Sequence, residues 1–486
     1  MAPYIEGLVE ALDAAGGRPV LRHGGRDVAG AALLADVHRY ARALDGLGIG
    51  RGDLVALLAP NSPDALAVRY AAHVIGAGAV YLSVPPNPER RARMIAQFAP
   101  RLVVVFPETA DLLPPVSAPL AAVGPVPGVS TRLDALAGVQ PDTPLPSRAR
   151  PEDLAVVISS GGTTGVPKGS RRTFASYTAA VACPPAPERR QLANGKLAYL
   201  TQILVDQTLL GGGTVVLQEE FDPATTLATV ERERITHLFL VEPQLFALMD
   251  DPRVPEHDLT SLRAVTHIGA AAAPVLRRRA RERLGPVIAH TYGASEMGIV
   301  AALSPAEHDR PSRFRCAGHV VPGVDVRFRR ADGGLDPGGG SIEVRSPAMA
   351  EGYRHRDAEE SERFVDGWYR TGDVGSLDAE GMLRIDGRAA DIAAAGAPPV
   401  DLQDTLCRLP SVRYAVVITD PDRGVALAAV EPWPGGSVDL AGCATALSVE
   451  HGVTLPILAF AAAIPRTEQG KPDRAAIGAA CAPVQA

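Results

Sequence analysis

The segment best suited to chemistry is a run of small and hydroxyl residues that ends in a lysine. It reads SSGGTTGVPKG and directly follows the apolar run Leu154–Ile158. Glycine N–H groups, hydroxyls and a lysine in such a loop can surround a polyphosphate, which indicates a nucleotide site, although a plain surface turn also fits. Only two residues separate Gly165 from Lys168, so the spacing of a P-loop NTPase is not met. The predicted phosphate-binding residues are Ser160, Gly161, Gly162, Thr163, Thr164, Gly165 and Lys168.

Other segments downstream carry side chains that suit nucleotide chemistry. The TYGASE segment combines Tyr292, an aromatic residue that can stack on a base, with Glu296, a carboxylate that can hold Mg²⁺. Asp373 lies beside a glycine turn and suits ribose hydroxyls, Arg388 adds a fixed cation, and Lys471 follows a glycine late in the sequence. Each residue alone also fits an ordinary structural role, so the evidence lies in their joint presence and order.

Taken together and in this order, the segments resemble the adenylate-forming superfamily of acyl-CoA synthetases, adenylation domains of peptide synthetases and luciferases. The resemblance extends from the first helix to Arg474. It implies a large N-terminal domain over 1–387, made of α/β subdomains and a barrel-like β subdomain, and a small mobile α+β C-terminal domain over 388–486. The implied reaction joins an acid to ATP·Mg²⁺ and yields an adenylate and pyrophosphate.

The resemblance also implies a role for each motif residue. Lys168 and its loop would hold the β- and γ-phosphates, Ser295 would face the α-phosphate, and Glu296 would bind Mg²⁺. Lys471 would bridge the α-phosphate and the acid oxygen, since two anions react only where cations are already arranged. The adenine, ribose and remaining phosphate contacts would come from Gly269, Ala270, Ala271, Tyr292, Gly293, Asp373 and Arg388.

The acid pocket is predicted by family position alone. Relatives commonly have a Pro-hydrophobic-x-His stretch where this chain reads AYLTQ, so Gln202 stands nearest the histidine position. No aspartate is identifiable that would hold the ammonium group of an amino acid, which favours a plain aryl or short acyl acid. The predicted pocket residues are Gln202, Asp206, Glu242, His267, Gly269 and Met297.

The segment after Arg388 departs from the family pattern. Ala390 stands at the hinge position, where aspartate or lysine is expected, and Ala394 and Ala397 replace a lysine and a glycine. In relatives this loop lines the pantetheine tunnel, and the pair Pro398-Pro399 stiffens it here. Neutral drift explains the change equally well. We nevertheless expect CoA, although possible as a substrate, to be a poor acceptor and a nitrogen nucleophile to be favoured.

Three functions remain open at this stage. The first is an AMP-forming ligase that transfers a small acid to CoA or a carrier protein. The second is an amide-forming or diazotase-type relative, in which adenylated carboxylate or nitrite is attacked by an amine, including an aryl amine. The third is an inactive nucleotide-binding homologue, which the presence of Lys168, Glu296, Asp373, Arg388 and Lys471 together argues against.

The elements that must position these residues are short apolar runs separated by helix-like segments, which predicts an α/β fold with buried parallel strands. After about Arg313 shorter strands and glycine-rich turns predict an antiparallel or barrel-like part. The alanine-rich stretch 389–399 predicts a flexible linker, and 115–146 a surface excursion. The predicted strands are 55–58, 79–82, 102–106, 155–158, 214–217, 237–241 and 264–268, with helices over 31–47 and 274–284.

Composition excludes several other classes. The 486 residues suffice for two to four domains, and a net charge of −7 without long like-charged runs argues against nucleic-acid binding. The five cysteines lack metal or disulfide spacing, which suits a reducing compartment. The first residues carry Glu6, Glu10 and Asp13 and predict an amphipathic helix, and no apolar run is long enough for a membrane span. We expect a soluble, cytoplasmic monomer or homodimer.

Overall fold

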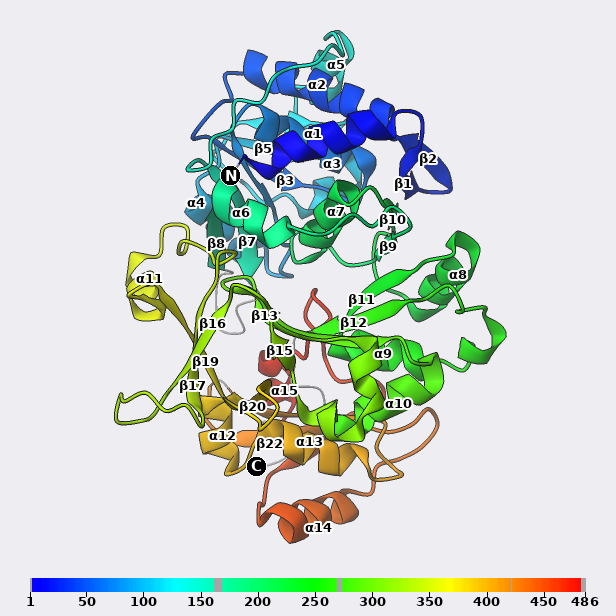
Figure 1. Ribbon diagram of the computed structural model, residues 1–486, viewed down its shortest axis with the longest axis vertical. Coiled ribbons are helices and arrows are strands. Elements are labelled where there is room, and N and C mark those ends of the chain that lie inside the picture. Colours follow the sequence, from blue (N-terminus) through cyan, green and yellow to red (C-terminus); the bar gives the residue numbers. More distant parts are fainter. Residues whose placement is uncertain (1, 161–167, 269–272, 421, 482–486) are drawn as a thin grey trace.

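The computed structural model describes residues 2–160, 168–268, 273–420 and 422–481 (Figure 1). These residues form three β-sheets with helices packed against them, which confirms the expected α/β class. Within them, no helix is both long and apolar enough to cross a membrane. The α-helices are α1 (Tyr4–Ala15), α2 (Gly30–Gly46), α3 (Pro63–Val74), α4 (Pro88–Phe98), α5 (Leu133–Gly138), α6 (Phe174–Val181), α7 (Thr201–Leu210), α8 (Pro223–Glu233), α9 (Glu242–Met249), α10 (Pro274–Leu284), α11 (Asp357–Arg363), α12 (Ala389–Ala395), α13 (Pro399–Cys407), α14 (Leu440–His451) and α15 (Arg474–Cys481), and the 3₁₀ helices are η1 (Pro107–Leu112), η2 (Val254–Glu256), η3 (Pro305–Asp309) and η4 (Pro311–Arg315).

A six-stranded sheet occupies the N-terminal part of the molecule, in the order β6-β5-β3-β4-β7-β8. All neighbours are parallel except β7 and β8. Every residue of β3 is buried, as expected for a parallel strand enclosed between layers. The carboxyl ends of β3, β4 and β7 therefore meet at one edge of the sheet, where ligands bind in open α/β sheets. The strands are β3 (Leu54–Leu58), β4 (Gly78–Tyr81), β5 (Leu102–Val105), β6 (Leu120–Ala122), β7 (Leu154–Ser160) and β8 (Lys168–Thr173).

A larger sheet runs through the centre, in the order β16-β17-β19-β20-β15-β14-β13-β12-β11-β9-β10-β1-β2, with β18 on β19. Pairing is parallel from β13 to β1 and antiparallel among the strands from β13 to β16 along that path. The strands are β1 (Pro19–His23), β2 (Arg26–Ala29), β9 (Arg190–Ala193), β10 (Thr214–Leu217), β11 (His237–Val241), β12 (Ala264–Ile268), β13 (Ile288–Ala294), β14 (Gly298–Leu303), β15 (Gly318–Val320), β16 (Asp325–Arg329), β17 (Gly340–Arg345), β18 (Phe364–Val365), β19 (Trp368–Leu377) and β20 (Met382–Arg388).

The third sheet belongs to the C-terminal part and contains β21 (Tyr414–Thr419), β22 (Ala426–Glu431) and β23 (Ile457–Ala459). Its core is continuous with that of α9 and α10, because apolar side chains of both parts form one cluster. Within it the rings of Phe246 and Tyr414 stack at 4.8 Å between centroids. β20 continues through Arg388 and α12 begins at the next residue. The division of the chain at 387/388 stays a prediction.

The sequence located the buried parallel strands well but misjudged two alanine-rich segments. Each predicted strand overlaps an observed one, and 237–241 and 264–268 match β11 and β12 in full. The supposed surface excursion instead supplies β6, which pairs with β5, and α5, which packs on α2. The supposed linker contains α12, since alanine strongly favours helix. Gly396, with φ +77°, then ends that helix in the left-handed conformation.

A buried ion pair joins α3 to α7 beneath the first sheet. Two nitrogens of Arg69 donate to the two carboxylate oxygens of Asp206 at 3.0 and 2.6 Å. The hydroxyls of Tyr70 and Tyr177 donate to the same carboxylate, each at 2.6 Å. Neither charged side chain is exposed to solvent. The predicted place of Asp206 in the acid pocket is therefore not supported, because its carboxylate already serves the interior of the fold.

Asp206→Asn should lower the free energy of unfolding by about 3 kcal/mol, because Arg69 would keep a buried charge without its partner. Urea titration measures the change. Asp325→Asn is the matched control, since its ion pair with Arg345 is more than half exposed and should contribute less than about 0.5 kcal/mol. Unchanged stability of Asp206→Asn together with lost activity would return Asp206 to the acid pocket.

Candidate active site

Two adjacent strands hold the base of the predicted phosphate loop. β7 ends at Ser160 and β8 begins at Lys168, and these two residues pair directly across the antiparallel strands. The intervening predicted residues, 161–165, lie outside the described residues. The Nζ of Lys168 lies 2.5 Å from a carboxylate oxygen of Glu359 on α11 and 5.2 Å from the ring centre of Tyr353. Lys168 therefore directly follows the loop segment, and its ammonium forms an ion pair with Glu359 of α11.

Glu296 lies in the turn between β13 and β14, where its carboxylate is buried but hydrogen-bonded. One oxygen accepts from the hydroxyl of Ser295 at 2.9 Å and the other from that of Tyr353 at 3.2 Å. Mg²⁺ is usually held by one or two carboxylates together with substrate phosphates. Glu296 fits this ion, because its carboxylate offers hard oxygen ligands. A bound Mg²⁺ would neutralise phosphate charge there.

Asp373 and Arg388 face each other across β19 and β20. The Nε of Arg388 lies 2.8 Å from one oxygen of Asp373, and the hydroxyl of Tyr292 donates to the other at 2.6 Å. Burial raises the pKa of Asp373, while the charge of Arg388 and the hydrogen bond from Tyr292 act against that rise. Each carboxylate oxygen has a second lone pair to accept a further donor. The structure thus brings together three residues predicted to contact the nucleoside.

Strand packing gives a second reason for the glycine of the TYGASE segment, in addition to its predicted contact with the nucleotide. A Cβ on Gly293 would lie 2.4 Å from the carbonyl oxygen of Gly298, so the close approach of β13 and β14 requires glycine. The sequence predicted this glycine for close approach to the nucleotide. The other predicted adenine contacts, Gly269, Ala270 and Ala271, lie outside the described residues.

Lys471 lies on a hairpin that crosses from the C-terminal part toward the centre of the molecule. Arg466 and Pro472 pair as an isolated bridge. Inside the hairpin the N–H of Thr467 donates to the carbonyl of Lys471 at 2.7 Å. Gly470 has φ +79° and lies against Gln244 on α9, where a Cβ would come within 3.1 Å of that side chain. In Figure 1 the red segment extends toward β12 and β13 accordingly.

Two charged groups from distant parts of the chain, Glu296 and Arg388, act on the ammonium of Lys471. Desolvation lowers the pKa of the Lys471 ammonium, the charge of Arg388 lowers it further, and the carboxylate of Glu296 opposes both. The Lys471 residue as a whole is exposed to solvent, although it also lines a small cavity beside α9. Lys471, Arg388 and Glu296 are therefore electrostatic neighbours, although more than 80 residues separate each from the next along the chain. Only the tertiary fold produces this arrangement.

Glu242, a predicted acid-pocket residue, shares a small cavity with Lys471. Both line a cavity of about 40 Å³ between α9 and the C-terminal part. One carboxylate oxygen of Glu242 accepts from the amide of Gln403 at 2.7 Å, and the hydroxyl of Tyr414 lies 3.5 Å from the same oxygen. Burial raises the pKa of Glu242. The geometry makes Glu242 a contact between the two parts of the chain, and its predicted role toward the acid stays a prediction.

Gln202, His267 and Met297 line neither this cavity nor the larger one beside β3 and β4, and Gly269 lies outside the described residues. Gln202 is buried and donates to the carbonyl of Leu197 at 3.1 Å. His267 packs against His290 with ring centroids 4.4 Å apart, and burial lowers its pKa, so it is neutral. Met297 belongs to the apolar core of the antiparallel part. The roles of these residues toward the acid stay predictions.

Two residues near Glu296 carried no signal in the sequence. Tyr353 follows a loop after β17 and reaches Glu296 through its hydroxyl. Arg172 on β8 is buried, and its Nε donates to the carbonyl of Ala348 at 2.9 Å. Desolvation lowers the pKa of Arg172 to about 10, against the charge of Glu296. Neither residue belongs to a motif, because both approach Glu296 only through strand pairing and loop packing.

A family model described as AMP-binding enzyme matches residues 8–354, which is more than half of the chain. The chain belongs to the AMP-binding enzyme family. Its similarity to family members extends over most of its length. A medium/long-chain-fatty-acid–CoA ligase, FadD8 of Mycobacterium tuberculosis, is 31% identical over 87% of this chain and 78% of its own. A feruloyl-CoA synthase of Amycolatopsis sp is 30% identical over 90% of this chain and 92% of its own.

Among solved structures, the amide bond synthetase McbA from Marinactinospora thermotolerans superposes with a TM-score of 0.85 and 33% identity. The match covers 98% of this chain and 99% of that one. This AMP-binding enzyme is therefore an ATP-dependent, AMP-forming acid ligase of the acyl-CoA ligase type. The roles of individual site residues stay predictions.

Lys471→Ala should slow adenylate formation about a hundredfold while ATP binding survives, because a cation at the reacting phosphate contributes roughly 3 kcal/mol to the transition state. ATP–pyrophosphate exchange measures the rate, and isothermal titration measures ATP binding. Gln469→Ala, on the same hairpin, is the control and should exchange normally. Exchange by Lys471→Ala above a third of the wild-type rate would contradict the role.

The pH dependence of exchange gives a second readout for Lys471. Because its pKa is lowered from 10.5, the ammonium loses its proton at a lower pH than an ordinary lysine does. The kcat/KM for the acid should fall as pH rises through this lowered pKa, and Lys471→Arg should move that fall to higher pH.

Asp373→Ala should raise the KM for ATP about tenfold or more, since hydrogen bonds to a charged group contribute roughly 1.5–3 kcal/mol. The KM is measured at saturating acid by pyrophosphate release. Asp332→Ala, in an exposed turn of the same part of the chain, is the control. An unchanged KM for ATP would remove Asp373 from the ribose site.

Proposed function

We propose that this AMP-binding enzyme joins a small acid to an amine. It activates a carboxylate, aryl or short acyl, as the acyl-adenylate and releases pyrophosphate. The amine nitrogen then attacks the acyl carbon, the bond from that carbon to AMP breaks, AMP leaves with the electron pair, and the nitrogen loses a proton. The predicted motif residues act in the first step, in which Lys471 would place its charge between the acid and the α-phosphate.

The observation that carries this proposal is the segment after Arg388. This segment forms the helix α12, and it has Ala394 and Ala397 where a lysine and a glycine are expected in relatives. Asp391 of α12 is buried and binds Arg474 through two hydrogen bonds, of 2.8 and 2.5 Å. Burial acts to raise the pKa of Asp391, but the bonds from Arg474 prevail and hold it below its usual value. In relatives this segment lines the pantetheine tunnel. Its different structure here supports an acceptor that needs no such tunnel.

Contacts between the two parts of the chain support the same proposal. Gln403 and Tyr414 reach Glu242, and Tyr414 stacks on Phe246. These contacts hold the C-terminal part in the orientation that brings Lys471 to Glu296 and Arg388. An amine that enters in this orientation can react without a large rotation.

A second candidate is a CoA ligase. The relatives named for fatty-acid and feruloyl substrates favour it, because they are at least 30% identical over most of this chain. The two candidates share the adenylation step and differ only in the acceptor. A test of the acceptor therefore separates them.

A panel of acids, including nitrite as well as aryl and short acyl acids, is first offered with ATP while pyrophosphate is counted. CoA or an amine is then supplied with the best acid, and AMP release is followed with product mass. We expect an amide, with CoA at least about tenfold slower than the best amine, a difference of about 1.4 kcal/mol in barrier.

The double variant Ala394→Lys/Ala397→Gly is the matched test of the segment, since it restores the residue types of CoA ligases. It should raise the rate with CoA and leave adenylation unchanged. Rapid, stoichiometric acyl-CoA formation by the unaltered enzyme would return the chain to the CoA ligases. Absence of pyrophosphate release with every acid would indicate an inactive homologue.

A further inference from the structure

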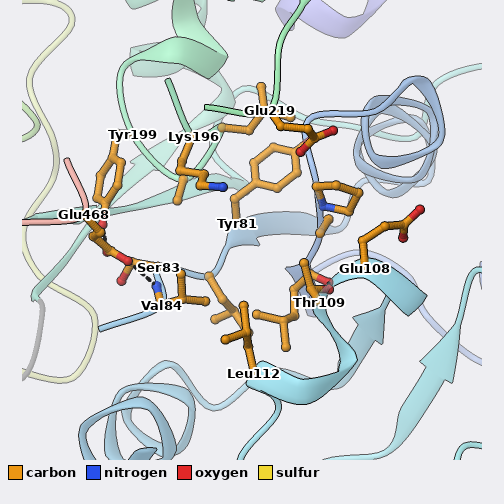
Figure 2. A pocket seen from close by; sticks show the side chains of 16 residues that line it. Tyr81, Ser83, Val84, Glu108, Thr109, Leu112, Lys196, Tyr199, Glu219 and Glu468 are labelled. Carbon is orange, nitrogen blue, oxygen red and sulfur yellow. Dashed lines mark hydrogen bonds between the residues drawn. The ribbon is translucent and has the colours of Figure 1, made fainter. Parts of the chain in front are cut away.

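A second, larger cavity lies at the carboxyl ends of β3 and β4 and has a volume of about 130 Å³ (Figure 2). Its walls come from the segments after these strands, from η1, and from the stretch before α7. Glu468 of the Lys471 hairpin closes one side. Because β4 neighbours β7, the cavity lies along the same sheet edge as the phosphate loop.

The floor of the cavity is apolar. Leu58 ends β3 and Leu82 follows β4, and both line the cavity together with Tyr81 of β4. Leu112 of η1 points into the same space (Figure 2). A cavity of about 150 Å³ lined by apolar side chains can hold a benzene ring. The volume here suits a small ring or a short alkyl chain.

The rim of the cavity carries net negative charge. Three carboxylates, those of Glu108, Glu219 and Glu468, face a single cation, Lys196. Glu219 already pairs with His23 and accepts a hydrogen bond from the N–H of Asn61. Such a rim attracts a cation and repels phosphate groups.

Glu468 is the carboxylate best placed to hold a ligand. The N–H of Val84 donates to one of its oxygens at 2.8 Å, and the hydroxyl of Tyr199 donates to the other. Desolvation raises its pKa, against the N–H of Val84 and the charges of Lys196 and Arg91. Both oxygens keep a lone pair for a further donor from the cavity.

The cavity is coupled to the predicted reaction centre through the hairpin. Glu468 and Lys471 are three residues apart, and the hydrogen bonds of Thr467 to Lys471 and of Gly470 to Thr467 make this turn tight. A ligand that contacts Glu468 therefore lies beside the hairpin that carries Lys471. The cavity lies against Glu468 of this hairpin, and the charges of Glu296 and Arg388 act on the ammonium of Lys471 in the same hairpin.

We propose that this cavity binds the amine acceptor. The N–H groups of a primary amine donate to the carboxylate of Glu468, and its small ring or alkyl part packs on Leu58, Leu82 and Leu112. The acidic rim disfavours CoA, whose phosphates would meet three carboxylates. This inference rests on the proposed amide-forming function and assigns to Glu468 the positioning of the amine.

The first test compares two amines. Benzylamine has an ammonium group and a ring that fits the cavity, whereas hydroxylamine has no apolar part. Glu468→Gln should raise the KM for benzylamine about tenfold or more, since a charge-assisted hydrogen bond is lost. The glutamine can still accept from Val84, so the hairpin keeps its place. Pyrophosphate exchange should stay unchanged, and the KM for hydroxylamine should rise as well, because its N–H groups lose the same carboxylate. Every value should stay unchanged for the control Glu152→Gln in an exposed turn.

Leu112→Trp is a second, steric variant, because the indole would fill the floor of the cavity. It should also raise the KM for benzylamine and spare hydroxylamine. Equal KM values for benzylamine in wild type, Glu468→Gln and Leu112→Trp would overturn the assignment.

A binding measurement separates this inference from the proposed function. Isothermal titration of benzylamine into the enzyme without ATP or acid should show binding that Glu468→Gln weakens about tenfold or more. Binding unaffected by both variants overturns the cavity assignment, even where amide is formed. Binding weakened by both variants supports the assignment, and an enzyme that then yields no amide with any amine contradicts only the proposed function.

Discussion

The predicted chemistry depends on the placement of one cation, the ammonium of Lys471, among charges from other parts of the chain. The hairpin that carries it is short and tightly bonded, so the position of the C-terminal part decides where the charge lies. Desolvation and the charge of Arg388 both lower the pKa of this ammonium, and the carboxylate of Glu296 acts to raise it. A site with this balance suits a ligand that brings further negative charge, as a nucleotide with an acid does.

The surroundings of the hairpin explain how that placement is held. On one side Gly470 packs on α9, and on the other Glu468 binds the backbone of Val84. Farther away Gln403 contributes a hydrogen bond to the buried Glu242. These contacts are polar and few, while the apolar cluster shared by α9, α10 and the third sheet supplies the larger contact. The polar contacts select the orientation, and the apolar cluster stabilises it.

Buried charges serve two different purposes in this fold. The carboxylate of Asp206 has all its strong donors from Arg69 and two tyrosines, so it has little capacity for a substrate. The carboxylate of Asp373 is also buried, but its partners are Arg388, which ends β20, and Tyr292 of β13, both in the predicted nucleotide site. Residue type alone does not separate these cases. The two carboxylates differ in how many hydrogen-bond donors they already have and in where those donors come from.

The sequence by itself determined the α/β class, most of the buried strands and the AMP-binding family, because apolar runs and ordered motifs are local properties of the chain. It did not determine that 389–395 is helical: alanine favours helix, but so short a helix is stable only with tertiary contacts such as that of Asp391 with Arg474. It also could not find Tyr353 beside Glu296, or the cavity closed by Glu468. These depend on contacts between residues far apart in sequence, and only the packing of strands and loops brings such residues within hydrogen-bond distance.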